Sequence, residues 1–176
     1  FGVTNMKCKR ISIDLAKNIF QLCAISEDNQ ILMNKKVKRS QLLHELRQFE
    51  PTTIVMEACY SSNPWGRAIE KIGHKVLLIP AFIVKPFLIG NKNDANDALA
   101  IFEASLRPQT RFVKVKSVEQ QDIQSLQRAR ELLVKQRTAS INQIRGFLSE
   151  YGIIAPKGAK NIIAKTEDAL EDSGNE

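Results

Sequence analysis

The chain has 176 residues, of which 26 are Lys or Arg and 19 are Asp or Glu, so its formal net charge is +7. Hydrophobic residues make up 43% and charged residues 26%, which is the composition of a globular protein and excludes a disordered or collagen-like chain. No apolar run approaches the roughly 20 residues of a membrane-spanning helix, and three cysteines are too few for a disulfide framework. We therefore expect a protein of the reducing cytoplasm that has no membrane partner.

The basic residues are unevenly distributed along the chain. Residues 1–50 and 106–150 carry the positive excess, whereas residues 51–105 are balanced and residues 151–176 are acidic. A neutral centre between two basic stretches indicates binding to a polyanion such as a nucleic acid. A solvated surface with a lysine excess explains the same distribution, and charge alone does not choose between the two explanations.

The first hundred residues alternate between strand and helix patterns. Near the start, Ile11 and Ile13 alternate with Ser12 and Asp14, which is the two-residue period of a strand. The predicted elements are strands over 10–16, 18–26 and 31–37, a helix over 40–49 capped by Ser40, a strand over 52–56, a helix over 63–72, a strand over 75–79 and a helix from Asn93 or Asp94 to Leu106. This order predicts an α/β fold with a mixed sheet flanked by helices, and it is the element order of the ribonuclease-H-like fold.

A long helix is predicted from Ser117 to Tyr151, after a short basic extended piece over 111–116. The helical stretch contains no Pro and a single Gly, and apolar residues recur at steps of three and four or their multiples, as in a coiled-coil arm. Its other faces carry basic residues that are candidate nucleic-acid contacts, although a solvated face has the same pattern: Arg128, Arg130, Lys135, Arg137 and Arg145. The acidic tail after Thr166 is expected to be frayed.

Four carboxylates are candidates for chemistry. Asp14 lies inside a strand that otherwise reads as core, Glu57 follows the buried strand over 52–56, and Asp94 and Asp97 share one turn of a predicted helix. Each alone has an ordinary explanation, as a solvent-facing strand residue, a strand end or an acid in the first turn of a helix. If the first and fourth strands are neighbours, however, Asp14 and Glu57 lie side by side, and a helix laid across the sheet adds the other two.

Converging carboxylates repel one another unless cations neutralise them. Hard oxygen ligands of this kind select Mg²⁺ or Mn²⁺ over zinc. Two such ions roughly 4 Å apart can clamp the attacking and leaving oxygens of a phosphodiester. The four acids therefore predict cleavage of a nucleic-acid backbone, although their spacing alone does not settle it.

Other residues give weaker signals. Lys92, beside Asp94, is a candidate phosphate contact, and a solvated lysine is the alternative. His44 and His74 lie in no motif, and we expect them at the surface or at helix ends rather than as catalytic bases.

Several segments, taken together and in order, resemble a known family. They include residues 13–18 (IDLAKN), 56–59 (MEAC), 90–98 (GNKNDANDA), 115–122 (VKSVEQQD), 133–138 (LVKQRT) and 142–146 (NQIRG). The set resembles the N-terminal part of the DEDD transposases of the insertion-sequence-110 family, relatives of the Piv DNA invertase. The likeness runs from about Arg10 to Gly158.

The resemblance implies a fold like that of the RuvC Holliday-junction resolvase, with Asp14, Glu57, Asp94 and Asp97 as the DEDD tetrad that coordinates Mg²⁺. It implies a DNA transposase or site-specific recombinase of a mobile element, which acts through a junction-like intermediate on the bacterial nucleoid. Some members are guided by a structured RNA, so the implied partners are DNA and, for such members, a guide RNA. The arm resembles the family's coiled-coil region, which implies a homo-oligomer.

The chain differs from full-length members in one respect. Those members continue into a second domain whose serine attacks DNA, whereas this chain ends at Glu176. We therefore expect a metal-binding domain over 1–116, an arm over 117–158 and, over 159–176, an acidic tail that begins the second domain, with recombination incomplete without that domain. Two alternatives stay open, namely a self-sufficient resolvase-like nuclease that uses water and a non-catalytic module for nucleic-acid binding or oligomerisation.

Overall fold

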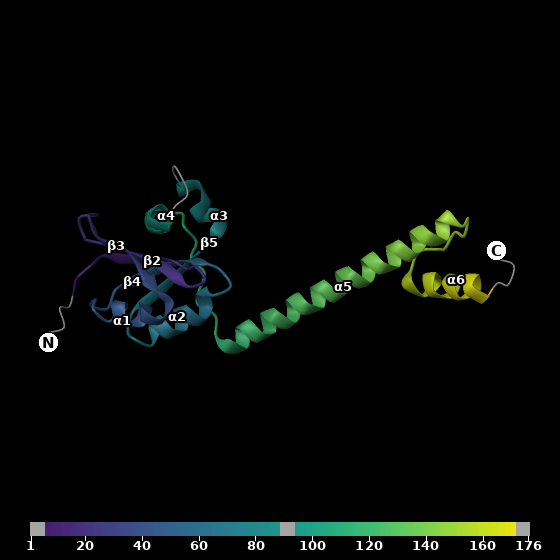
Figure 1. Ribbon diagram of the computed structural model, residues 1–176, viewed down its shortest axis with the longest axis horizontal. Coiled ribbons are helices and arrows are strands. Elements are labelled where there is room, and N and C mark those ends of the chain that lie inside the picture. Colours follow the sequence, from purple (N-terminus) through teal and green to yellow (C-terminus); the bar gives the residue numbers. More distant parts are fainter. Residues whose placement is uncertain (1–5, 89–93, 172–176) are drawn as a thin grey trace. The chain divides into compact units, whose positions relative to one another are not determined.

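The computed structural model describes residues 6–88 and 94–171, and the chain divides into two compact units, Phe1–Ser117 and Val118–Glu176. The first unit is a five-stranded sheet with helices on both faces (Figure 1). Its strands are β1 (Arg10–Asp14), β2 (Ile19–Ile25), β3 (Ile31–Lys38), β4 (Thr53–Ala58) and β5 (Lys75–Pro80). Its helices are α1 (Leu42–Leu46), α2 (Ser62–Glu70), α3 (Ala81–Val84) and α4 (Asp94–Leu106), with 3₁₀ turns η1 (Arg39–Gln41) and η2 (Lys85–Phe87).

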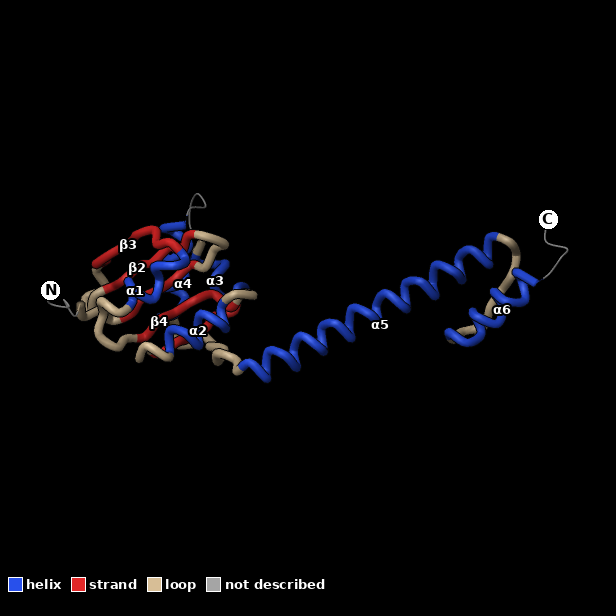
Figure 2. The backbone as a smooth tube through the Cα atoms, turned by 60° about the horizontal axis from the view of Figure 1, so that its bottom comes forward, coloured by secondary structure: helices blue, strands red, loops and turns tan. Residues whose placement is uncertain are grey.

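The sheet has the strand order β3-β2-β1-β4-β5. The pairs β1–β2 and β2–β3 are antiparallel, whereas β1–β4 and β4–β5 are parallel. In Figure 2 all five strands fall in the first unit, and the second unit is helical. The predicted mixed sheet flanked by helices is therefore confirmed, and this α/β fold is consistent with a ribonuclease-H-like domain.

The two faces of the sheet are covered differently. Ile11 and Ile13 are fully buried on the face against which α1 and α2 pack. Ser12 lies on the opposite face, where its hydroxyl donates a hydrogen bond to the carbonyl oxygen of Ala98 in α4 at 2.6 Å. Figure 1 shows α1 and α2 on one side of the sheet and α3 and α4 on the other. The polar side of the β1 alternation therefore faces a helix and not solvent.

The extended segment 111–116 lies beside the first unit's sheet and α2. Val113 forms an isolated antiparallel bridge with Leu78 of β5. Gly66 of α2 faces Val115 so closely that an added Cβ would lie 2.6 Å from the Val115 Cγ2 atom. Only glycine permits this approach of the helix to the segment without a shift.

Two predictions on single residues are wrong. Ser40 lies inside η1, and the N-cap of α1 is Gln41, which makes no capping bond with its side chain. His74 is buried, not at the surface. Its Nδ1 accepts a hydrogen bond from the Thr52 N–H at 3.2 Å, and its Nε2 lies 3.1 Å from the carbonyl oxygen of Leu46. A ring that accepts at Nδ1 and donates at Nε2 is neutral. Burial lowers the pKa of His74, and the bond to Leu46 opposes part of that shift.

The second unit consists of α5 (Val118–Glu150) and α6 (Ala159–Glu171). Helix α5 confirms the long helix that the sequence predicts. Helix α6 corrects the expected frayed tail, since Ile162 is buried in a small cluster with Leu148 and Ala155. The acidic composition of this segment concealed its apolar positions. No helix in the described part of the chain is long and apolar enough to cross a bilayer.

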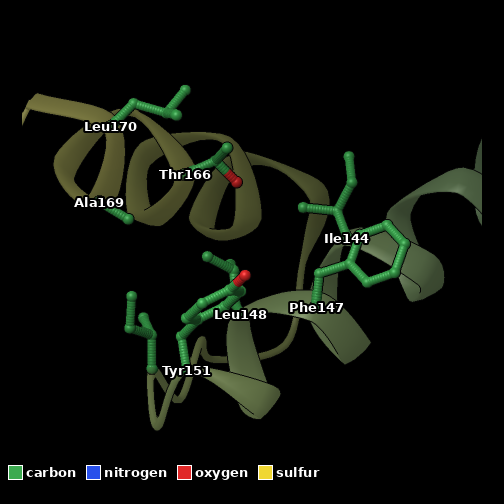
Figure 3. A pocket seen from close by; sticks show the side chains of 8 residues that line it. Ile144, Phe147, Leu148, Tyr151, Thr166, Ala169 and Leu170 are labelled. Carbon is green, nitrogen blue, oxygen red and sulfur yellow. The ribbon is translucent and has the colours of Figure 1, made fainter. Parts of the chain in front are cut away.

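An apolar pocket of about 560 Å³ lies between the end of α5 and α6 (Figure 3). Its wall on the α5 side includes Phe147, Leu148 and Tyr151, and Ala169 and Leu170 line the α6 side. No Asp, Glu, His, Cys or Lys is among the described residues that line it. The described lining of this pocket therefore offers no carboxylate, imidazole, thiol or amine for chemistry.

Candidate metal centre

Asp14 and Glu57 stand at the carboxyl ends of neighbouring strands. β1 and β4 pair in parallel through Ile13 and Met56, the residues directly before the two acids. The carboxyl ends of parallel strands reach the same edge of a sheet, and both acids are partly buried there. The β1 alternation also directs Asp14 to the face that α4 covers. Strand pairing therefore brings together two acids that are far apart in the sequence.

Helix α4 supplies the other two acids. It begins at Asp94 and carries Asp97 in its first turn. Besides the Ser12 bond described above, Arg10 of β1 donates to the carbonyl oxygen of Ser105 at 2.7 Å and so anchors the far end of the helix. These side-chain ties from β1 fix the start of α4 over the end of that strand.

The four acids surround one pocket of about 670 Å³. Carboxylate oxygens of Asp14, Asp94 and Asp97 lie within 4.8 Å of one another. Glu57 lines the same pocket without belonging to this three-residue cluster. All four carboxylates that the sequence analysis singled out are thus found at a single place in the fold.

The electrostatics of the pocket follow from this crowding. Burial raises the pKa of Glu57, and the negative charge of Asp97 raises it further. The Lys36 ammonium group lies 2.9 Å from the Asp94 carboxylate, and Lys85 also lines the pocket, so two cations offset part of the negative charge. The pocket therefore holds more anionic groups than nearby cations, which favours binding of a further cation.

The donor set fits a hard divalent cation. Oxygens bound to one Mg²⁺ at about 2.1 Å lie at most about 4.2 Å apart, so a small change of rotamer closes the three-acid cluster around an ion. No Cys or His is among the described residues that line the pocket, which disfavours a zinc site. Asp14, Asp94 and Asp97 would hold the ion, with Glu57 beside them.

The candidate nucleic-acid contacts have a different placement. Lys92 lies outside the described residues. The five basic residues of α5 belong to the second unit, and all are exposed except Arg145, which is half-buried and donates to the Asn142 side-chain oxygen at 2.9 Å.

Lys36 is a residue beside the pocket that the sequence did not predict. The strand register carries the signal, because Asp14 pairs with Gln21 and Gln21 pairs with Lys36 across the meander. These three residues form one row on the face that α4 covers. The row was not visible before the exact register of the two hairpins was known.

Comparisons with known proteins identify the family of this chain. The model of the DEDD transposases of the IS110 type, described as "Transposase", matches residues 11–153. The transposase for insertion sequence element IS1111A of Coxiella burnetii is 46% identical over 152 residues, which is 86% of this chain and 42% of that protein. A Pseudomonas aeruginosa protein named "Probable family 20 transposase" is 44% identical over 152 residues, which is 86% of this chain and 45% of that protein. The transposase for insertion sequence element IS1328 of Yersinia enterocolitica is 39% identical over 148 residues, which is 84% of this chain and 44% of that protein.

The chain thus spans less than half the length of these curated relatives. The family match nevertheless includes the sheet apart from its first residue, Arg10, together with all four acids of the pocket and the whole of α5. A match of this extent identifies the family: the chain belongs to the IS110 family of DEDD transposases.

Proposed function

We propose that this chain is the metal-binding part of a DNA transposase that cleaves and rejoins DNA strands with the help of Mg²⁺ or Mn²⁺. The observation that carries the proposal is the approach of Asp14, Asp94 and Asp97 to within 4.8 Å of one another, with Glu57 in the same pocket. Relatives named as transposases of insertion sequences support it. A divalent ion bound there supplies positive charge to the oxygens of a phosphodiester as strand exchange proceeds.

Two of the four acids come from the sheet and two from helix α4. Asp14 and Glu57 bind from the strand ends, and Asp94 and Asp97 complete the site from the first turn of α4. In each cleavage an oxygen nucleophile forms a bond to phosphorus while the bond to the leaving oxygen of the DNA breaks. None of the four acids is that nucleophile, which we assign to a serine of a further domain or to water.

The wider role follows from the family. We propose that the protein works on the bacterial nucleoid, in the cytoplasm, through a junction-like DNA intermediate. Selection of the DNA by a structured RNA is part of this proposal, with the exposed basic residues of α5 as contacts to nucleic-acid phosphates.

Helix α5 also suits assembly of a homo-oligomer. Large apolar side chains are exposed along it, among them Val118, Leu126 (72% exposed) and Leu133. Pairing of α5 with a second copy in a coiled coil would bury this stripe. Sedimentation equilibrium tests the assembly, since Leu126→Glu with Leu133→Glu would yield a monomer.

Calorimetric titration with Mn²⁺ tests the metal site directly. We expect wild type to bind, and Asp14→Asn and Asp97→Asn each to lose at least about a hundredfold in affinity, more than the loss of a supporting residue costs. Glu103→Gln is the matched control, because Glu103 is an exposed acid on the same helix and does not line the pocket. Equal affinity in all four proteins would refute the metal site.

Four-way DNA junctions separate this function from its alternatives. Cleavage of a junction by this chain alone in Mg²⁺ would favour a self-sufficient nuclease that uses water. Binding that survives loss of all four carboxylates and falls steeply with salt, without cleavage, would favour a non-catalytic nucleic-acid-binding module. Our proposal predicts metal binding that depends on the acids, with little or no cleavage by the chain alone.

A further inference from the structure

An ion pair joins β3, an edge strand of the sheet, to the candidate metal centre. The Lys36 ammonium nitrogen lies 2.9 Å from the Asp94 carboxylate oxygen Oδ2, and the side chains are 64% and 56% exposed. Asp94 is also one of the three acids that cluster within 4.8 Å. Lys36 is thus paired with a carboxylate that would otherwise be available to a divalent cation in this pocket.

The backbone position of Lys36 does not depend on that ion pair. Gln21 lies directly opposite Lys36 in the β2–β3 ladder, is only 5% exposed and donates from Nε2 to the Asn34 side-chain oxygen at 2.5 Å. Asn34 in turn donates to the carbonyl oxygen of Ala95, in the first turn of α4, at 3.5 Å. This chain of amides ties β3 to the start of α4, so Lys36 stays at the edge of the pocket when its ammonium group leaves Asp94.

The orientation of the amides leaves one buried acceptor open. Because Asn34 directs its NH₂ group to Ala95, its oxygen must face Gln21, which turns the Gln21 NH₂ group towards Asn34. The Gln21 oxygen Oε1 is buried and has no hydrogen-bond donor within residues 6–88 and 94–171. A buried acceptor without a donor is costly, so this position favours a donor that arrives with a ligand or with a released lysine.

A cleft of about 480 Å³ opens beside these groups. Gln21, Asn34, Lys36, Asp94 and Ala95 are among the residues that line it. Asp94 lines both this cleft and the acidic pocket, so the two hollows meet at that residue. The acidic pocket is suited to a divalent cation. The cleft presents an ammonium group and amide groups to a ligand that binds beside that cation.

We propose that Lys36 changes partners when a divalent cation binds: its ammonium group leaves Asp94 and binds a non-bridging phosphate oxygen of the DNA strand that lies in the cleft. This inference rests on the proposed function and identifies a phosphate subsite beside the metal. An exposed ion pair changes an equilibrium constant by no more than about fivefold, so a divalent cation displaces the lysine readily. A lysine ammonium group binds phosphate as a compact point charge, without the fixed geometry that arginine needs.

Lys36→Ala has opposite effects on the two ligands in this scheme. We expect its Mn²⁺ affinity, measured by calorimetry, to rise by up to about fivefold, because a competing cation is gone. We expect its affinity for a labelled four-way DNA junction in Ca²⁺, measured by fluorescence anisotropy, to fall about tenfold, as for loss of a charged hydrogen bond. The slope of log affinity against log salt should become shallower by about one, as for loss of one phosphate contact.

Lys71→Ala is the matched control. Lys71 has the same charge, is exposed at the end of α2, which covers the other face of the sheet, and lines neither hollow. We expect it to leave Mn²⁺ affinity and the salt slope close to wild type. Lys36→Arg keeps the charge and should retain the wild-type salt slope, and thermal unfolding checks that every variant is folded.

The outcomes separate the inference from the function on which it rests. If Asp14→Asn and Asp97→Asn bind Mn²⁺ as wild type does, the metal site fails, and the partner exchange fails with it. If those variants lose Mn²⁺ while Lys36→Ala matches Lys71→Ala in either the metal or the DNA assay, the phosphate subsite alone is overturned. Opposite changes confined to Lys36→Ala support it.

Discussion

The two faces of the sheet are built from the same strands but differ in composition: one face is an apolar core, and the other carries the acidic pocket. On the face covered by α1 and α2, the β1 side chains Ile11 and Ile13 are fully buried in one continuous apolar cluster. On the face covered by α4, the same strand presents Ser12, whose hydroxyl donates a hydrogen bond to the helix, and Asp14, a candidate metal ligand in the pocket. Alternate residues of a single strand thus serve stability and chemistry separately, which makes the consequence of each substitution predictable from its position in the alternation.

The difference between the faces also explains how the acids are tolerated. Three carboxylates within 4.8 Å repel one another and destabilise the cation-free protein. The apolar face, with large buried side chains such as Phe20, Leu22 and Leu46, contributes the burial that offsets this cost. We therefore expect the first face to govern unfolding and the second to govern ligand binding.

The largest effect is expected at Ile13. Ile13→Ala removes a fully buried side chain and should lower the free energy of unfolding by about 2–5 kcal/mol, measured by urea denaturation. The adjacent variant Asp14→Asn, on the other face, should change it by no more than about 1 kcal/mol. An equal loss of unfolding free energy in the two variants would contradict the expectation that the apolar face alone governs unfolding.

Gly66 offers a second test on the apolar side. Gly66→Ala places a Cβ 2.6 Å from a Val115 methyl carbon, and overpacking of this kind costs about 1–3 kcal/mol. Helix propensity alone predicts the opposite sign, a gain of about 1 kcal/mol. The control is Gly146→Ala in α5, where nothing lies within 4 Å of the added Cβ and a gain in thermal stability is expected. A stabilised Gly66→Ala protein would show that α2 does not pack closely on Val115.

Asp97 tests the other face with a smaller effect of opposite sign. Asp97→Asn removes one charge from a repelling cluster and should stabilise the cation-free protein by up to about 1 kcal/mol. It should also abolish the rise in Tm that Mg²⁺ gives wild type, because a ligand stabilises only the state that binds it. Thermal unfolding in EDTA and in excess Mg²⁺ measures both effects, with Glu103→Gln as the control. A destabilised variant in EDTA would mean that Asp97 has a structural role instead.

Much of the fold was predictable because local patterns determine it. The alternation in β1 predicts a strand, and the three- and four-residue period of α5 predicts a helix. The four acids were also recognisable, since each stands at a strand or helix end where family motifs coincide. Their meeting depends on β1 and β4 being neighbours, which the sequence analysis could only assume.

The features that were missed depend on contacts between distant segments. Lys36 belongs to the site only through the register of two hairpins, which determines that it shares a face with Asp14. His74 has an ordinary loop context in the sequence, and only the fold brings it between Thr52 and Leu46. For α6, acidic composition gave the wrong impression, because burial of Ile162 needs the end of α5 as its partner.

The smallest expected effect is on the pH dependence of stability, and it comes from His74, which contacts α1 on the apolar side of the sheet. Burial keeps the folded-state pKa of His74 below its ordinary value of 6.5, so the unfolded chain takes up a proton first as the pH falls. The stability that neutral His74 contributes is therefore complete above about pH 6.5 and is lost as the pH falls towards the lowered folded-state pKa. Urea denaturation of wild type and His74→Gln across this range isolates the effect, because every other ionisable group is common to both proteins and its contribution cancels in the difference. The stability advantage of wild type should shrink on acidification, and a difference that does not vary with pH would mean that burial does not lower the pKa of His74.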